Sequence, residues 1–398
     1  MKWYLGIDIG KLTHVVCIMN ELGEVVKLPL SFTQNSLGWQ RFDSYLNSII
    51  DHMEYPSVQA GFEATGHYWT TLYLKLKHLG MKVSVLNPLE VKAFRNEGIR
   101  GNKTDSIDAV KIAKLLRFGD FRETYVPDEQ TTGLRQLTRL KIDLSVMQAQ
   151  LKQKCLAILD QVFPEYGALF SDVFGTSSRA LLSEASTPEA ITALSTTKLT
   201  GILRKASRGR LRENKARQIK QQACVSVGIT FSLDAFTLSL DVLLSQVDHL
   251  EEQIVELNTE IAKRVKTIKT TIQSIPGIGP DTAGVILSEV GDFNRLISKD
   301  GAEKLVALAG LDPKIKESGK YKGKTKMSKR GSAYLRHAVR NAAFIAVAVS
   351  KDPMFTRIYQ KHIDKGKHTE VALSHVARKM LHVIYALLKN KTKYKPVV

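Results

Sequence analysis

The sequence predicts an α/β domain followed by a mostly helical remainder, and two observations support this fold class. Strand and helix signals alternate over the first third of the 398-residue chain. From about Asp128 the strand signals disappear and long helical patterns take over. At roughly 100–200 residues per domain, a chain of this length predicts two or three units. We place these units at 1–125, 126–270 and 271–398.

The chain opens with three consecutive strand signals. WYLGIDI at 3–9, THVVCIM at 13–19 and EVVKLPLSF at 24–32 alternate or concentrate β-branched and apolar residues, and a turn around Gly23 joins the last two. Short connections of this kind predict an antiparallel meander.

Helices and strands then alternate. The predicted elements are a helix at 37–50, a strand at 58–63, a helix at 68–79, a strand at 82–86 that Asn87 and Pro88 stop, and a helix at 105–117. Three antiparallel strands followed by this alternation are the order expected of a ribonuclease-H-like fold.

The middle of the chain carries two apolar series with the spacing of coiled-coil arms. They are Leu134, Leu137, Leu144, Leu151 and Ile158, and then Leu243, Val247, Leu250, Ile254, Leu257 and Ile261. Between them, about 161–237 is predicted to be a helical insertion. Its stretch 204–220 holds eight Lys or Arg and one Glu, so one face could lie on a nucleic-acid backbone. A simply solvated helix is the alternative.

The last third opens with IPGIGPDTAGVIL at 275–287. Gly277 and Gly279 allow a tight turn, and Pro280 suits the first turn of a helix, so free backbone N–H groups could point at a phosphate. The stretch is similar to a helix-hairpin-helix element, with a plain interhelical turn as the alternative. A terminal helix is predicted at about 370–388.

A strongly basic segment follows, with ten Lys or Arg against two acids between Asp312 and Arg340. The positions predicted to bind nucleic acid come from this segment, the glycine loop, the insertion and the N-terminal unit. They are Lys103, Arg204, Arg208, Arg210, Arg212, Gly277, Gly279, Lys314, Lys316, Lys320, Lys322, Lys324, Lys329, Arg330 and Arg336.

The net charge of +19 and a pI near 9.7 favour a polyanionic partner. Nucleic acid is preferred to an anionic membrane because the basic residues lie in glycine-bearing loops rather than on a clear amphipathic helix. No apolar run approaches the ~20 residues of a membrane span, the longest being around 342–349. With a strand rather than a signal peptide at its start, the chain is expected in the cytoplasm.

The cysteines and histidines indicate no structural zinc. Cys17, Cys155 and Cys224 are far apart, without the spacing of a zinc site or a disulfide framework, and are predicted to be plain thiols. His67 and His337 lie near other candidate residues, where a phosphate or packing contact is a more frequent role than metal ligation.

Four acidic residues form a candidate metal site. Asp8 lies inside the first strand signal, Glu63 ends another strand, and Asp105 and Asp108 are three apart and share a helix face. Together they would repel one another unless Mg²⁺ or Mn²⁺ neutralised them, and two such ions can stabilise the attacking and leaving oxygens of a phosphodiester. The last two acids could instead simply favour a helix N-terminus.

The strings GIDIGK, FEATGHY and KTDSIDA resemble the DEDD motifs of the insertion-sequence-110 recombinases, the bacterial transposase group that includes the Piv and MooV DNA invertases. The blocks occur in the family's order over nearly the whole chain. The resemblance implies a RuvC-like N-terminal domain holding the four acids. It also implies a C-terminal transposase domain whose conserved serine corresponds to Ser318.

The same resemblance implies the chemistry. Ser318 would attack the scissile phosphorus and form a 5′-phosphoserine link, with Tyr321, Ser328 and Ser332 as competing hydroxyls. Subunits would pair as a dimer or tetramer through the coiled-coil arms and complete one another's active sites, and a bridge RNA would guide the reaction on donor and target DNA. The insertion between the arms is longer than in compact members of the family.

Two other functions stay open at this point. In a metal-dependent nuclease or junction resolvase, water would attack and the serine would only contact phosphate. A non-catalytic nucleic-acid-binding protein would keep DNA binding without metal-dependent chemistry.

Overall fold

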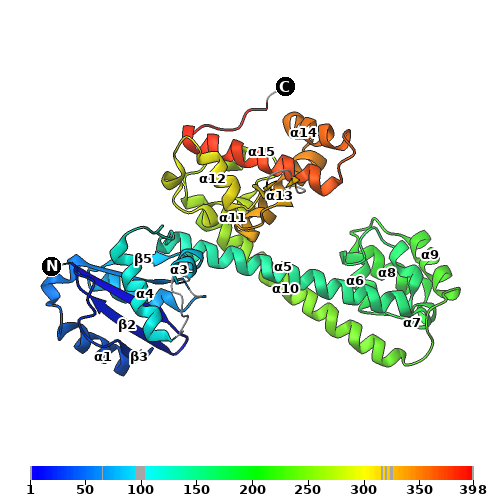
Figure 1. Cartoon of the computed structure of the whole chain (residues 1–398). Helices are drawn as coiled ribbons and strands as arrows, with labels where there is room; N and C mark the ends of the chain where they lie inside the picture. The colour runs from blue at the N-terminus through cyan, green and yellow to red at the C-terminus, as the bar shows by residue number, and fades with distance from the viewer. Residues whose placement is uncertain are drawn as a thin grey trace. The chain divides into compact units, whose positions relative to one another are not determined.

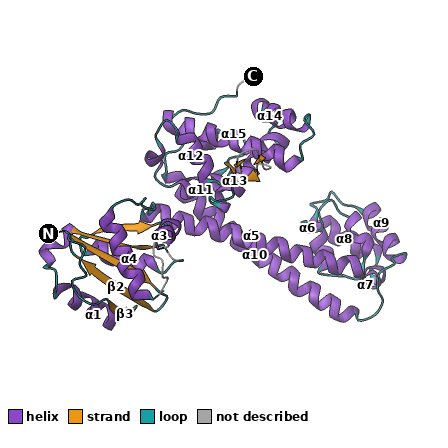
Figure 2. Cartoon of the chain, viewed as in Figure 1, coloured by secondary structure: helices purple, strands orange, loops and turns teal. Residues whose placement is uncertain are grey.

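The computed structural model describes residues 2–64, 66–95, 104–314, 317–318, 321–322 and 326–396. The chain divides into two compact units, Met1–Val126 and Pro127–Val398. The first unit is α/β and the second is mostly helical, as the sequence predicts (Figure 2).

The first unit is built on a five-stranded sheet of order β3-β2-β1-β4-β5 (Figure 1). Its strands are β1 (Trp3–Ile9), β2 (Thr13–Met19), β3 (Leu30–Thr33), β4 (Val58–Glu63) and β5 (Lys82–Leu86). β1 is antiparallel to β2 and parallel to β4, and β2 and β3 complete the antiparallel meander.

The third strand is shorter than predicted. Of the expected 24–32 only the end forms β3, and Val25 makes an isolated bridge to Met19. The Leu28 side chain is 86% exposed, so pairing this residue into the sheet would bury little apolar surface. Pro29, which lacks a backbone N–H, interrupts the ladder.

Helices cover both faces of this sheet. The helices are α1 (Ser36–Asn47), α2 (Trp69–His78), α3 (Pro88–Arg95) and α4 (Asp105–Phe118), with a 3-10 turn η1 (His52–Ser57). α1 and α2 supply the core on one face, including Phe42 and Leu72, and α4 packs against β1, β2 and β4 on the other face. α3 was not predicted: Pro88 stops a strand but also opens a helix well.

Two long helices form the arm of the second unit, α5 (Glu129–Val162) and α10 (Leu233–Thr267), and they pack along one another within one chain (Figure 1). The predicted long helices are therefore present. Their apolar positions serve packing inside the subunit, and pairing between subunits stays a prediction.

The insertion is a small helical domain with its own core. Its elements are η2 (Pro164–Ala168), α6 (Thr176–Leu182), α7 (Pro188–Ala193), α8 (Thr196–Ala206) and α9 (Glu213–Cys224). The basic stretch 204–220 is not one helix: a turn between α8 and α9 divides it, and Arg208 has a φ of 52° there. The basic side chains therefore belong to two helices and the turn between them rather than to a single helical face.

The C-terminal part packs on the other end of the arm, where Leu134, Ile261 and Val265 join its core. Its helices are α11 (Pro280–Val290), α12 (Gly301–Leu308), α13 (Ala333–Ala348), α14 (Pro353–Ile363) and α15 (Thr369–Asn390), with 3-10 turns η3 (Ile272–Ser274) and η4 (Phe293–Leu296). Two short ladders pair β6 (Pro313–Lys314) with β9 (Lys326–Met327) and β7 (Glu317–Ser318) with β8 (Tyr321–Lys322).

Within the described ranges, α15 alone has the length and apolarity of a possible membrane span. The most apolar long stretch is thus this helix rather than 342–349. Half of its apolar window is buried inside the protein, and Met380 and Ile384 belong to the C-terminal core, so α15 packs as a core helix.

Candidate active site

Asp8 and Glu63 lie on the sheet face that α4 covers. Along β1, Leu5, Ile7 and Ile9 pack on the opposite face with α1 and α2. Because side chains alternate along a strand, Gly6 and Asp8 face α4. Glu63 lies on the same face by the same argument, since Phe62 belongs to the opposite core.

The two acids are also adjacent across the ladder. β1 and β4 run parallel with Ile7 paired to Phe62, so Asp8 and Glu63 occupy the next level of neighbouring strands. Both are half-buried at the end where β1 and β4 terminate. We call this end the carboxyl edge.

α4 runs opposite to β1 and brings its N-terminus to the carboxyl edge. A Cβ on Gly6 would lie 2.2 Å from the Ala109 carbonyl oxygen and 2.3 Å from the Ala113 nitrogen, so the helix and strand backbones nearly touch. At the other end of α4, Arg117 Nε donates to the Glu21 carbonyl oxygen at 3.0 Å. Glu21 lies beyond the amino end of β1, where its carboxylate accepts from the Lys2 backbone N–H.

Asp105 and Asp108 therefore reach the same edge as the strand acids. Thr104 caps the helix, its hydroxyl accepting from the Ile107 N–H at 3.3 Å. Asp105 is exposed, whereas Asp108 is only 4% exposed. The backbone thus assembles four carboxylates around one edge. In the described part of the chain, however, no three His, Cys, Asp or Glu side chains stand close enough together to hold a metal ion.

The backbone of Ser318 lies in β7, paired with Tyr321 of β8, while its side chain lies outside the described residues. Lys103, Lys316, Lys320 and Lys324 lie outside them altogether, and of Lys322 only the backbone is described.

The segment that carries Ser318 is closed at its base by two glycines. Gly310 has a φ of 64°, and a Cβ on Gly331 would lie 2.4 Å from the Gly310 nitrogen. Backbone bonds from Lys329 to Gly310 (3.1 Å) and from Ser332 to Leu308 (2.7 Å) complete the closure. The two ends of the segment are therefore held together by backbone contacts that admit no side chain.

Two of the competing hydroxyls have structural partners. Ser328 donates to the carboxylate of Asp312. Ser332 caps α13, accepting from the Leu335 N–H at 3.1 Å, and donates to Glu289 at 2.9 Å. Neither is poised as a free nucleophile.

The described basic candidates differ in availability. Lys314, Lys329 and Arg330 are exposed. Arg336 instead donates to the Ala309 carbonyl oxygen at 2.9 Å, so part of its guanidinium holds the base of the Ser318 segment.

The IPGIG loop has the predicted turn. Gly277 has a φ of 89° and packs so tightly on α13 that a Cβ would lie 2.3 Å from the Ala342 carbonyl oxygen. Gly279 caps α11 and Pro280 begins it, beside a cavity of about 550 Å³. Asp281 also lines this cavity. Burial raises the pKa of this carboxyl, but the ion pair and hydrogen bond with Lys141 (3.1 Å) and the hydrogen bonds from Thr282 together outweigh burial and lower the pKa overall.

Residues 5–164 match a family described as Transposase, and residues 269–360 match the Transposase IS116/IS110/IS902 family. The chain belongs to the IS110 family of transposases. The first match contains all four carboxylates of the carboxyl edge, and the second contains Ser318.

Relatives of this transposase align over almost their full length. A 43.6 kDa protein of insertion element IS110 from Streptomyces coelicolor is 25% identical, over 98% of this chain and 95% of the relative. The pilin gene-inverting protein of Moraxella bovis is 24% identical, over 99% and 98%. A 44.8 kDa protein of insertion element IS116 from Streptomyces clavuligerus is 26% identical, over 99% and 96%.

Sequence reasoning missed one buried polar cluster in this transposase. Arg139 of α5 donates to the buried Glu289 of α11, and the Arg139 guanidinium lies 4.9 Å from the centre of the ring of Tyr334 in α13. The signal was present in the sequence: Glu289 is a single acid in the apolar run TAGVILSEV, and an acid there needs a partner.

Proposed function

We propose that this transposase cuts and rejoins DNA through Ser318, with Mg²⁺ or Mn²⁺ at the carboxyl edge and a bridge RNA as guide. A transposase is an enzyme that acts on DNA, and a relative that aligns with 99% of this chain is named for inverting a pilin gene. The single observation that carries the proposal is the placement of four acids at one sheet edge by three separate elements.

The carboxyl edge has the chemistry of a site for a hard divalent cation. Asp8, Glu63, Asp105 and Asp108 offer oxygen ligands only, the donor type that Mg²⁺ and Mn²⁺ prefer. Binding requires these side chains to rotate toward one another, which exposed Asp105 can do freely. Bound there, divalent ions would stabilise charge on the attacking and leaving oxygens. The order of the sheet, three antiparallel strands and then two parallel ones, supports a RuvC-like domain.

The proposed covalent step balances as a transesterification. Ser318 Oγ forms a bond to the scissile phosphorus and loses its proton, while the bond from phosphorus to the 3′ oxygen breaks and that oxygen takes up a proton. The product is a 5′-phosphoserine link and a free 3′ hydroxyl. Attack by another 3′ hydroxyl reverses the step and rejoins DNA without an external energy source.

The acids and the serine belong to different units of the chain, so the proposal needs them brought together by folding or by subunit pairing. Pairing through the α5–α10 arm would let one subunit's serine complete another's carboxyl edge. The guide RNA would be bound through its shape and backbone, as the charge of +19 favours.

The test of the metal site is cleavage of labelled donor DNA by the full chain with its RNA, with and without Mg²⁺. Asp8→Asn should abolish cleavage, whereas Asp120→Asn should leave it intact. Asp120 is an exposed acid of the same unit, just after α4, and so controls for loss of one negative charge. Equal activity of the two variants would refute the metal site.

A further inference from the structure

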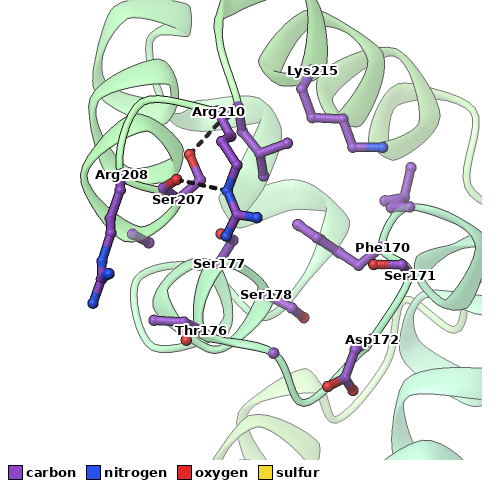
Figure 3. A pocket seen from close by; sticks show the side chains of 14 residues that line it. Phe170, Ser171, Asp172, Thr176, Ser177, Ser178, Ser207, Arg208, Arg210 and Lys215 are labelled. Carbon is purple, nitrogen blue, oxygen red and sulfur yellow. Dashed lines mark hydrogen bonds between the residues drawn. The ribbon is translucent and has the colours of Figure 1, made fainter. Parts of the chain in front are cut away.

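A cavity of about 640 Å³ opens in the small domain between α5 and α10, remote in sequence from every proposed catalytic residue (Figure 3). Two segments line it, 169–178 and 206–215. We call it the tip pocket. Its size is that of a pocket for a small organic ligand rather than for a single ion.

The tip pocket carries positive charge on more than one side. Arg208, Arg210 and Lys215 line it, and Figure 3 shows Arg210 reaching toward Ser177 while the Lys215 amine lies on the other side of the opening. Arg208 stands at the rim. In the described ranges of the chain, none of these three side chains forms an ion pair with an acid.

The nearby acids are engaged elsewhere or stand apart. Glu213 accepts two bonds from Arg217, at 3.0 and 2.6 Å. Asp172, on the opposite wall, accepts from the Phe174 backbone N–H at 2.9 Å. Lys215 Nζ donates to the amide oxygen of Gln218 at 2.9 Å, a neutral partner. The positive charge of Arg208, Arg210 and Lys215 is therefore not neutralised by an acid and can attract an anionic ligand.

The turn that presents the arginines is firmly built. Ser207 is buried, and its hydroxyl accepts from the Leu211 N–H at 2.8 Å. Arg208 adopts a φ of 52°, which non-glycine residues rarely do, and Gly209 follows at 83°. Arg210 Nε donates to the Ser207 carbonyl oxygen at 3.3 Å, which orients the guanidinium and leaves its terminal nitrogens for a ligand.

The wall across from the arginines is apolar and aromatic. Phe170 is half-buried, its ring centre 5.5 Å from that of Tyr166 and 5.7 Å from Lys215 Nζ. Leu211 directly follows the basic turn in sequence and lines the same cavity. A planar apolar group could pack here while an attached anion reached the arginines.

We propose that the tip pocket binds an unpaired nucleotide of a single-stranded nucleic-acid segment, its phosphate at Arg208, Arg210 and Lys215 and its base against Phe170 and Leu211. A concave pocket with an aromatic wall suits a base splayed out of a strand, whereas a duplex keeps its bases stacked inside. Exposed Arg204, Lys205 and Arg212 flank the turn and can follow the backbone on either side. The inference rests on the proposed function only in taking nucleic acid as the ligand.

The experiment measures binding of fluorescein-labelled 20-nucleotide probes to the full chain by anisotropy. The probes are single-stranded RNA, single-stranded DNA of the same sequence, and duplex DNA. The variants are the double change R210Q/K215Q and the matched double control K365Q/K367Q. Lys365 and Lys367 are exposed and do not line the pocket, so the control removes the same number of positive charges elsewhere.

R210Q/K215Q should bind single strands at least tenfold more weakly than K365Q/K367Q, with the slope of log K against log salt shallower by about 1–1.5. Phe170→Leu should weaken single-strand binding several-fold and duplex binding hardly at all. Circular dichroism melting verifies that each variant is folded. The single-stranded polymer with the larger loss is the pocket's ligand.

Equal binding by R210Q/K215Q and K365Q/K367Q would refute the proposed ligand of the tip pocket, and so would equal losses of affinity for duplex and single strands. The serine chemistry is read separately, from the covalent adduct at Ser318. If the double variant R210Q/K215Q keeps wild-type affinity for single strands and still forms the adduct, only the proposed ligand of the tip pocket is refuted. If the double variant loses affinity for single strands but the wild type forms no adduct, only the proposed serine chemistry is refuted.

Discussion

Arg139 and Glu289 form a two-bond ion pair that ties α5 to α11: Arg139 Nε donates to Oε1 at 2.6 Å and Nη2 donates to Oε2 at 2.9 Å. The Glu289 side chain is only 3% exposed. Ser332, which ends the segment carrying Ser318, donates to the same carboxylate. One buried acid thus joins the arm, the helix after the IPGIG loop and the base of the proposed catalytic segment.

Glu289→Gln should lower the free energy of unfolding by about 1–3 kcal/mol, because it removes the negative charge that accepts three partly buried hydrogen bonds. The matched control is Glu260→Gln, which breaks the more exposed pair between Glu260 and Arg264 and should change the free energy of unfolding far less, because solvent screens that pair. Urea denaturation followed by circular dichroism measures both. Equal losses of stability in the two variants would show that the Arg139–Glu289 pair stabilises the fold no more than the Glu260–Arg264 pair does.

Gly6→Ala should lower the free energy of unfolding by about 1–3 kcal/mol, because the new Cβ would overlap the α4 backbone and push the helix off β1. DNA cleavage should fall with it, since Asp108 moves with α4. Gly201→Ala makes the same chemical change in α8 with nothing within 4 Å of the new Cβ. There a gain of about 0.5–1 kcal/mol is expected. Thermal melting of both variants measures the two effects. An unchanged melting temperature in Gly6→Ala would contradict the close packing of α4 on β1.

How far the sequence predicts this molecule depends on whether the signal is local. β1, β2, β4, β5 and α4 lie where alternation and capping put them, because each carries its own pattern. The predicted third strand is too long, because the apolar residues within 24–29 do not reveal that Leu28 is exposed.

Contacts between distant segments were beyond prediction. Which acids share a sheet edge depends on the direction of α4 over β1. The pairing of Arg139 with Glu289 joins residues 150 apart. The basic run at 204–220 was recognised, but the turn that makes it one wall of a pocket was not. The close approach of Gly310 to Gly331 likewise needs coordinates, because glycine alone signals only freedom.

A thiol reagent should modify one cysteine of the native chain, Cys224, the exposed one. Burial raises the pKa of the Cys17 thiol to about 11, and burial also raises the pKa of Cys155, so near pH 8 both stay protonated and inaccessible. All three should react in guanidinium chloride. Mass spectrometry of the labelled peptides identifies the sites, and native labelling of Cys17 would contradict the packing of β2 under α4.

Stability of the first unit should fall as the pH drops below the ordinary histidine value of 6.5. Burial lowers the pKa of His14 despite its bond to Gln34, so below 6.5 the unfolded chain binds a proton that the folded chain refuses. The contribution is complete above 6.5 and declines toward the lower folded pKa. His14→Leu should therefore flatten the dependence of melting temperature on pH between about 7.5 and 5.5.

His52→Leu is the control for this titration, because the His52 side chain is 77% exposed. It should retain the wild-type pH dependence. An unchanged pH dependence in His14→Leu would mean that other groups of the unit dominate the acid side of its stability.

The most direct measurement of the central claim is a search for a covalent protein–DNA adduct. The full chain, Mg²⁺ and the RNA transcribed from the element's flank are incubated with labelled donor and target DNA, and the products are separated under denaturing conditions. Wild type and Ser328→Ala should both form the adduct, and Ser318→Ala should form none. Cleaved DNA without an adduct in wild type would contradict serine attack and leave a nuclease that uses water.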